Sequence, residues 1–364
     1  MKKQRKKYPL SAHLIAIALG IVAGAAIGFA IGPLIDALGT SPGQSLLLVG
    51  AALVALVVVW NLTVVVHEVG HLVFGLATGW RFVSFRIGRR IFVRKDGKMT
   101  LRRYTIPGTG GQCLMEPPSD EPPYFLYNFG GPFVNLLQGL LLLVPASGFV
   151  RLLCVEAGAL GLLVGVMNLI PFRRLPTDGG NLRRLKQNPA ARRALVTMMR
   201  VNAILTRGGS MRDVPAEWLP DGAPADGEDP LVLSDYIAAA DRTLALGDRE
   251  GALARYTYLL EHCPQMYNVH KNEVACYALM LEYLLHGNTE KAKELDTKEL
   301  RGYEKSTALY PSRAALAYAR ARANGETGEK ELAAFGKAAA GTPYPGDAAD
   351  LRRMLAEVSA PAAS

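Results

Sequence analysis

The stretch Val64–Gly75 reads VVVHEVGHLVFG and places two histidines and a glutamate inside a long apolar run. The run covers about residues 45–77, which is more than the roughly 20 apolar residues that a bilayer-spanning helix needs. Ionisable side chains are costly at that depth and usually mark a function. The stretch therefore predicts a membrane helix that tilts or projects from the bilayer and carries a polar site.

The motif HEVGH has the spacing of a metal site. On a helix, His67 and His71 project from one face, so both imidazoles can bind one zinc ion. Glu68 lies beside them and is placed to act on a water molecule at the metal. Histidines that only make hydrogen bonds in a core are the alternative, and the apolar setting of the motif disfavours it.

Other apolar segments predict the rest of a membrane domain. Lys and Arg crowd the tail 1–10 and the connection 80–123, whereas residues 36–43 contain none. The positive-inside rule therefore places both termini and the 80–123 connection in the cytosol, with HEVGH near the inner face. We expect a multi-pass protein of the cell membrane, from a bacterial source. About four spans are predicted, near residues 11–35, 45–77, 124–146 and 149–170.

The composition excludes some functions. The chain has 364 residues and a net charge of +9, but its basic residues flank apolar segments and do not form a stripe with aromatics between them. This distribution argues against nucleic acid as a partner. The 4 cysteines form no CxxC pair, so we expect free thiols in a reducing compartment.

The polar parts of the chain predict a small β-region and a helical domain. Residues 81–105 read as strands around Lys95–Lys98, whose central Asp-Gly favours a tight hairpin turn. In residues 231–358 the segment Gly247–Ala252 (GDREGA) recurs as Gly287–Ala292 (GNTEKA), which resembles tetratricopeptide hairpins that stack into a partner-binding surface. A generic helical bundle is the alternative for this domain.

The predicted fold class is therefore mainly α: a polytopic membrane helix bundle with a small cytosolic β-hairpin region, followed by a soluble all-α, tetratricopeptide-like domain. Residues 1–10 form a basic cytosolic tail and 11–185 the membrane domain. A connector and linker, rich in Gly, Pro and Asp from residue 207, covers 186–230. The helical domain follows at 231–358.

A catalytic zinc site needs three protein ligands, so another segment must complete the histidine pair. The stretch Asn168–Gly180 reads NLIPFRRLPTDGG at the cytosolic end of the fourth span. Asp178 is the strong acidic candidate in it, because two prolines stop the helix and two glycines let the backbone turn the carboxylate toward the metal. Glu156, within the fourth span, is the competing carboxylate, and an interfacial ion pair with Arg151 is the interpretation favoured for it.

Together, HEVGH and the downstream Asn-Pro-Asp-Gly pattern resemble the site-2 protease family of intramembrane zinc metalloproteases, peptidase family M50. The resemblance covers about residues 45–185, and Gly131–Asn135 (GPFVN) is similar to the GxxxN element of that family. The chain departs from the family pattern at Thr177, where leucine is usual, and Asn168 lies two residues further from the Asp than is common.

The resemblance implies roles for particular residues. The zinc ligands would be His67, His71 and Asp178, with one Zn²⁺ per chain. Glu68 would be the catalytic acid and base, and Asn168 and Asn135 would help to hold the substrate or the transition state. The 81–105 region would be a membrane-associated β-region whose strand edge pairs with an unwound substrate.

The sequence thus predicts a zinc metalloendopeptidase that hydrolyses membrane-anchored proteins within or next to a transmembrane segment. The expected partners are a membrane-protein substrate, the lipid bilayer and a protein regulator bound by residues 231–358. A catalytically vestigial membrane adaptor that acts through its C-terminal helical domain is the alternative function. Another type of membrane HExxH peptidase, with a glutamate such as Glu156 as third ligand, is a further one.

Overall fold

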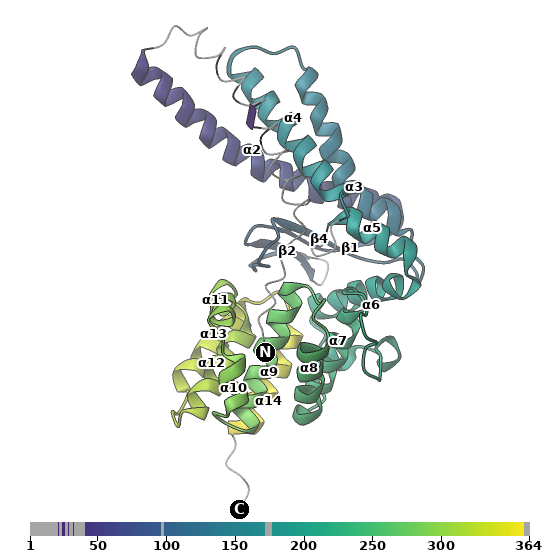
Figure 1. The fold of residues 1–364 in the computed structure, drawn as a ribbon, viewed down its shortest axis with the longest axis vertical. Helices are drawn as coiled ribbons and strands as arrows, with labels where there is room; N and C mark the ends of the chain where they lie inside the picture. The colour runs from purple at the N-terminus through teal and green to yellow at the C-terminus, as the bar shows by residue number, and fades with distance from the viewer. Residues whose placement is uncertain are drawn as a thin grey trace, which may run out of the picture. The chain divides into compact units, whose positions relative to one another are not determined.

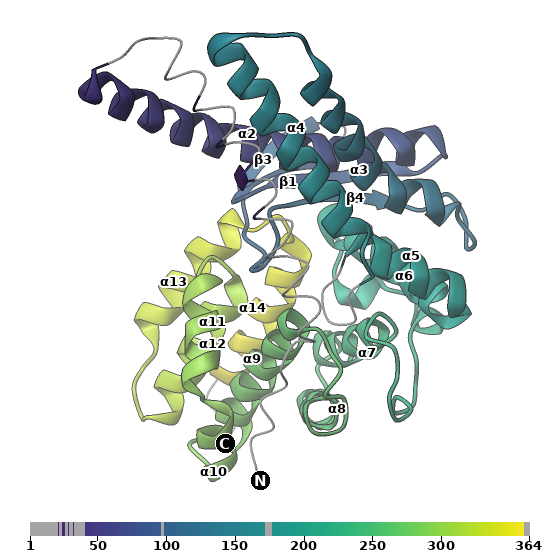
Figure 2. The ribbon, with the colours of Figure 1, turned by 45° about the horizontal axis from the view of Figure 1, so that its top comes forward.

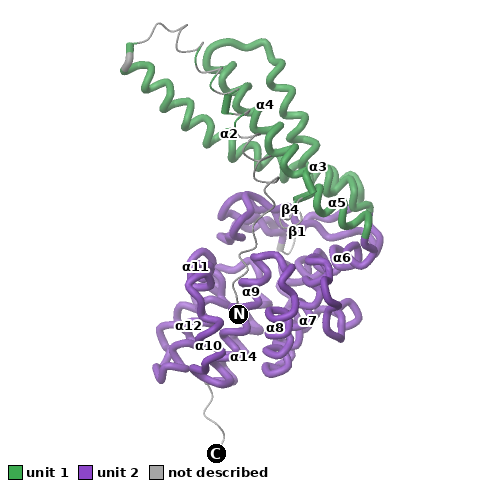
Figure 3. The backbone as a smooth tube through the Cα atoms, viewed as in Figure 1, with its two compact units in different colours: residues 1–79, 123–187 green, residues 80–122, 188–364 purple. Residues whose placement is uncertain are grey.

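The computed structural model describes residues 41–95, 98–171 and 177–359, with the single positions 21, 24, 25, 28 and 32. The first predicted span, 11–35, otherwise lies outside the described residues, as does the tail 1–10. The chain divides into two compact units: Met1–Gly79 with Pro123–Gln187, and Trp80–Pro122 with Asn188–Ser364 (Figure 3). Each unit therefore combines segments that are far apart in the sequence.

The first unit is helical (Figure 1). Among the described residues, three helices are long and apolar enough to cross a membrane, and they coincide with the second to fourth predicted spans. They are Gly43–Ala77, Tyr124–Leu143 and Gly148–Leu169. The described helical elements of this unit are α2 (Pro42–Ala77), α3 (Tyr124–Gln138), the 3-10 helix η1 (Gly139–Leu143), α4 (Gly148–Leu169) and α5 (Asp178–Gln187).

Small residues bring α2 and α3 together. A Cβ atom at Gly130 would lie only 2.6 Å from the carbonyl oxygen of Gly70, so side chains larger than hydrogen do not fit between the two backbones. A Cβ atom at Gly131 would collide with Nε2 of His71. The helix that carries HEVGH is therefore held backbone to backbone against α3, a contact that small residues permit in membrane helix bundles.

The second unit begins with an antiparallel sheet of β1 (Arg81–Ile87), β2 (Arg90–Lys95), β3 (Lys98–Arg103) and β4 (Gly111–Glu116). The order of the strands is β3-β2-β1-β4. Lys95 pairs with Lys98, as the predicted hairpin requires, although the turn residues between them lie outside the described ranges. The sheet extends beyond the predicted region 81–105, because β4 follows a loop that contains Gly108 and Gly110 and pairs with β1.

Helices make up the rest of this unit, and α9, α12, α13 and α14 lie side by side in both ribbon views (Figures 1 and 2). Their common core contains fully buried side chains such as Leu233, Tyr256, Leu279, Leu316 and Leu355. The helices are α6 (Pro189–Thr206), α7 (Leu233–Ala245), α8 (Arg249–His262), α9 (Asn268–Leu285), α10 (Glu290–Leu295), α11 (Lys298–Ser306), α12 (Pro311–Ala323), α13 (Glu329–Gly341) and α14 (Pro345–Ser359), with the 3-10 turns η2 (Met211–Asp213) and η3 (Ala216–Trp218).

The weak sequence repeat marks equivalent breaks between helices. Gly247 and Gly287 both adopt positive φ angles, of 100° and 77°, just after a helix ends. The next helix then begins with a side-chain cap: Asp248 accepts from the N–H of Gly251, and Thr289 from that of Ala292. The repeat is thus explained by a glycine that ends one helix and a polar residue that starts the next.

The sheet packs within the second unit, with the C-terminal helices. Tyr104, directly after β3, stacks on Tyr310 with ring centroids 4.6 Å apart and meets Tyr344 edge to face at 5.2 Å. The hydroxyl of Tyr310 donates to the carbonyl of Thr105 at 2.5 Å. The sequence groups the β-region with the membrane helices, whereas these contacts join it to helices that come about two hundred residues later.

The stretch predicted as a linker also contributes to this unit. Met211 and Val214 are buried and pack with Val201 and Ala245 in a small apolar cluster. Arg212 donates to the carbonyl of Ala245 at 2.5 Å. Residues 207–230 therefore form a packed connection that includes η2 and η3.

Candidate metal centre

The three predicted ligands meet in the first unit, where α2 approaches the first turn of α5. Nε2 of His67 lies 3.2 Å from Oδ2 of Asp178, and Nε2 of His71 lies 3.5 Å from Oδ1 of the same carboxylate. The two Nε2 atoms are 3.2 Å apart. The donor atoms of these residues thus converge on one point.

These separations fit a zinc ion. Zinc binds imidazole nitrogen and carboxylate oxygen at about 2.0–2.2 Å, and neighbouring donors in a tetrahedron around it stand about 3.3 Å apart. The separations in the cluster are 3.2, 3.2 and 3.5 Å. The two histidines approach different oxygens of Asp178, and with one ligand atom from each residue the three donors lie within 4.8 Å of one another. His67, His71 and Asp178 can therefore share one metal ion and leave a further position for water or substrate.

Each imidazole is oriented by a hydrogen bond at its other nitrogen. Nδ1 of His71 lies 2.7 Å from the backbone carbonyl of Tyr127, which can only accept, so Nδ1 carries the proton. Nδ1 of His67 lies 2.6 Å from the side-chain oxygen of Asn135. Such partners fix the tautomer and the direction of a metal-binding histidine.

The threonine at position 177 has a local structural role. The Thr177 hydroxyl donates to the carbonyl of Ile170 at 2.8 Å and accepts from the N–H of Gly180 at 3.2 Å. It thus ties the end of α4 to the first turn of α5. Gly179 is required in that turn, because a Cβ atom there would collide with the backbone carbonyl of Leu169.

Asp178, the first residue of α5, is held in the charged form that binds metals. Its burial disfavours the carboxylate, but the adjacent imidazoles of His71 and His67 outweigh this effect and hold the pKa of Asp178 below its usual range.

The other predicted site residues have different surroundings. Glu68 is buried on α2 with an exposed fraction of 7%. Asn135 is fully buried and contacts His67, as described above. Asn168 lies in the last turn of α4, where its amide donates to the carbonyl of Val164 one turn earlier at 3.0 Å.

The prediction of an ion pair between Arg151 and Glu156 is wrong. Arg151 donates to the backbone carbonyls of Leu142 and Val144, at 2.8 and 3.2 Å. Glu156 is fully buried, and neither of its carboxylate oxygens has a hydrogen-bond partner among the described residues. Arg151 instead donates its hydrogen bonds to carbonyl groups at the end of η1. Of the two candidate carboxylates, Asp178 is the one that lies beside the two histidines.

Two residues of the site have only a weak signal in the sequence, or none. Tyr127 acts through its backbone carbonyl, which every residue type possesses. Gln138 donates to Thr63 and to the Ala157 carbonyl, and so joins α3 to α2 and α4. A glutamine in an apolar span is a signal that could have drawn attention to this position.

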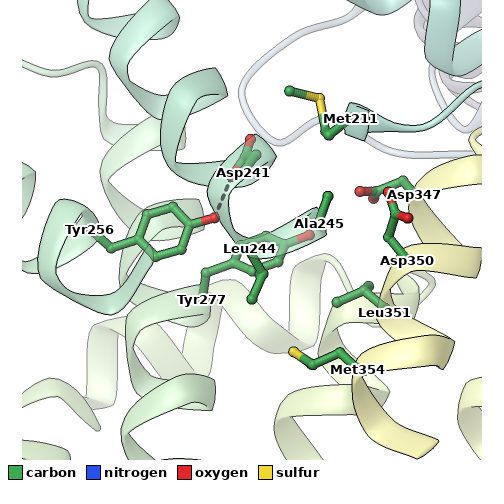
Figure 4. Close-up of a pocket in the computed structure, with 10 residues that line it drawn as sticks. All are labelled: Met211, Asp241, Leu244, Ala245, Tyr256, Tyr277, Asp347, Asp350, Leu351 and Met354. Atoms are coloured by element: carbon green, nitrogen blue, oxygen red, sulfur yellow. Dashed lines mark hydrogen bonds between the residues drawn. The ribbon is translucent and has the colours of Figure 1, made fainter. Parts of the chain in front are cut away.

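The second unit contains a small cavity lined by residues of η2, α7, α8, α9 and α14 (Figure 4). The cavity has room for about one water molecule. The hydroxyl of Tyr256 donates to Asp241 at 2.5 Å, while Asp347 and Asp350 reach the cavity from α14. Burial, reinforced by nearby carboxylates, raises the pKa of Asp241 and of Asp347 to about 7.

Comparison with known proteins adds one match. A family model described as Peptidase family M50 matches residues 52–150. No curated protein and no solved structure gives a significant match. The matched segment includes HEVGH and Asn135 but ends before Asp178 and the C-terminal helices. The match is therefore a similarity of this segment, about a quarter of the chain, to peptidase family M50.

Proposed function

We propose that this chain is an intramembrane zinc metalloendopeptidase that hydrolyses membrane-anchored proteins within or next to a transmembrane segment. The observation that carries the proposal is the convergence of His67, His71 and Asp178 within reach of one metal ion, at the end of an apolar helix. The family match over residues 52–150 supports the same class of reaction.

The proposal gives each residue a chemical task. A zinc ion held by His67, His71 and Asp178 would supply Lewis acidity, which activates water near neutral pH and polarises a carbonyl group. Glu68 takes the proton of the attacking water and returns it to the leaving amine. The carboxylate of Glu68 is buried, so its proton transfers occur in a site that largely excludes bulk water.

The two asparagines take different parts in this scheme. Asn135 acts on His67, because its amide is already engaged with protein groups on both sides. Asn168 holds the substrate or the transition state from the end of α4. The substrate must be locally extended, since a helical peptide bond is covered by its own hydrogen bonds.

Topology and partners belong to the same proposal. The protein is multi-pass, with both termini in the cytosol, and the described spans α2, α3 and α4 form its catalytic part. Residues 231–358, which resemble tetratricopeptide hairpins, bind the substrate or a protein regulator.

The test uses the full-length protein and its Glu68→Gln variant. We expect purified wild type to contain one zinc per chain and the variant to retain that zinc while cleavage stops. Membrane proteins that accumulate intact, or that co-purify with the variant only, are then the substrates. A wild type without zinc, together with a Glu68→Gln variant that supports function normally, would favour the membrane adaptor instead.

A further inference from the structure

We propose that Gln138 is a positioning residue that sets the orientation of Asn135 and, through it, the tautomer of His67. The inference rests on the proposed function, because the tautomer matters for metal binding. It concerns a chain of hydrogen bonds that lies wholly within the first unit and joins α2, α3 and α4.

The chain of hydrogen bonds begins at a backbone carbonyl. Nε2 of Gln138 donates to the carbonyl of Ala157 at 2.8 Å and to Oγ1 of Thr63, also at 2.8 Å. A carbonyl oxygen can only accept, so the nitrogen of the Gln138 amide, and not its oxygen, must face Ala157. The oxygen Oε1 of Gln138 is therefore turned toward Asn135.

Asn135 is fixed in the same way. Its Nδ2 donates to Oε1 of Gln138 at 3.3 Å and to the backbone carbonyl of Thr63 at 3.2 Å. Two acceptors on one side leave a single orientation for the amide, with Oδ1 on the side of His67. Both Asn135 and Thr63 are fully buried, so water cannot replace these bonds at low cost.

His67 is the last residue in this chain of hydrogen bonds. Because Oδ1 of Asn135 accepts at 2.6 Å, Nδ1 of His67 must carry the proton. Nε2 is then the nitrogen left to bind a metal, and it lies 3.2 Å from Oδ2 of Asp178. A flipped Asn135 would present its NH₂ group to Nδ1 and favour a proton on Nε2, where zinc has to bind.

The first measurement is zinc affinity, by competition with a chelator, on the full-length protein in detergent. We expect Gln138→Met to weaken zinc binding about tenfold, as is typical when a group behind a metal ligand is lost. Asn128→Ala is the matched control: Asn128 is a buried carboxamide on the same helix whose amide donates to Tyr124, and its loss should leave the affinity unchanged.

The second measurement tests whether Gln138 acts through Asn135. In an Asn135→Ala background, Gln138→Met should cause no further loss of zinc affinity, because the residue that it orients is gone. A merely structural contribution of Gln138 would instead persist in that background.

The third measurement needs no zinc. Nitrogen-edited NMR of labelled histidine in the metal-free protein should show a hydrogen-bonded, slowly exchanging Nδ1–H of His67 in wild type and faster exchange of that proton in Gln138→Met. If that variant does not fold, Thr63→Val removes one acceptor of the Gln138 amide and should weaken zinc binding about threefold, in the same direction.

Wild-type zinc affinity and unchanged exchange of the His67 Nδ1 proton in Gln138→Met would overturn the inference and leave the proposed function standing. Unchanged affinity in Thr63→Val, when Gln138→Met cannot be studied, would overturn it equally. A wild type that neither binds zinc nor cleaves would instead refute the proposed function, while exchange of the His67 Nδ1 proton would still decide the role of Gln138.

Discussion

The hydroxyl of Thr177 donates to the backbone carbonyl of Ile170 at 2.8 Å and so joins the end of α4 to the start of α5. The same oxygen accepts from the N–H of Gly180 in the first turn of α5. A leucine could pack here but could make neither bond. The unusual residue before Asp178 is thus part of the structure that presents the carboxylate.

Replacing Thr177 by valine should therefore affect both stability and the metal centre. Thr177→Val keeps the shape but removes the hydroxyl, and we expect a loss of about 1 kcal/mol in unfolding free energy, as for other helix caps. We also expect about tenfold weaker zinc binding, because Asp178 is the next residue. Thr177→Ser retains the hydroxyl and should behave like wild type in thermal unfolding and chelator competition; equal losses in both variants would contradict this account.

The contact between Gly131 and His71 predicts a strong effect of a single methyl group. In Gly131→Ala the new Cβ would collide with Nε2 of His71, so the imidazole must leave its position beside Asp178. We expect well under one zinc per chain in the purified protein, and about 1–3 kcal/mol of lost stability from overpacking. Gly50→Ala on α2, where a Cβ meets nothing within 4 Å, is the control and should keep full zinc content.

The acidic cavity of the second unit predicts how stability depends on pH. Burial raises the pKa of Asp241 to about 7, whereas the pKa of an unfolded aspartate is about 3.9. Between these values the folded state keeps a proton that the unfolded state has released. The stability that this group contributes is therefore complete below about pH 4 and is lost as the pH rises through about 7.

Asp241→Asn should remove the share of this dependence that Asp241 contributes, while Asp347 retains its own. One pKa unit corresponds to about 1.4 kcal/mol. We therefore expect the free energy of unfolding of the variant to exceed that of wild type by at least about 1 kcal/mol at pH 8, and to change less with pH between pH 5 and 8. Thermal unfolding of the full chain in detergent provides the measurement, and Asp221→Asn, at an exposed position, provides the control. If stability changed with pH in the same way in wild type and in Asp241→Asn, titration of Asp241 would not contribute to the pH dependence.

The stacked pair Tyr104 and Tyr310 predicts a link between the sheet and the C-terminal helices. Tyr104→Ala removes both aromatic contacts and should cost about 1–3 kcal/mol, with faster hydrogen exchange in β2 and β3. Tyr104→Phe keeps the ring, and exchange should stay close to wild type. If hydrogen exchange in these strands were the same in Tyr104→Ala as in wild type, the stacking would not be the contact that holds the sheet to the C-terminal helices.

Much of the metal centre could be anticipated, because its main signal is local. The spacing of His67 and His71 follows from helix geometry alone, and a third ligand is a requirement of zinc chemistry. Asp178 then followed from the scarcity of carboxylates near the ends of the spans. The structure places its carboxylate beside both imidazoles.

The remaining features depend on contacts between distant residues. The partner of His71 is a backbone carbonyl 56 positions away, and Thr63 and Gln138 are 75 positions apart. The ion pair of Arg151 with Glu156 was inferred from their closeness in sequence, but carbonyls exposed where η1 ends compete for the arginine. The position of the sheet was missed because an amphipathic hairpin carries no sign of which surface will cover it.

The pairing of Tyr310 with Thr105 across 205 residues has a consequence for biosynthesis. The strands leave the ribosome long before the helices that cover them, so the sheet must persist uncovered while the second half of the chain is made. A shortened chain that ends after the membrane spans would keep that exposed surface permanently. Quality-control proteases should then remove such truncated chains, so that only complete copies accumulate in the membrane.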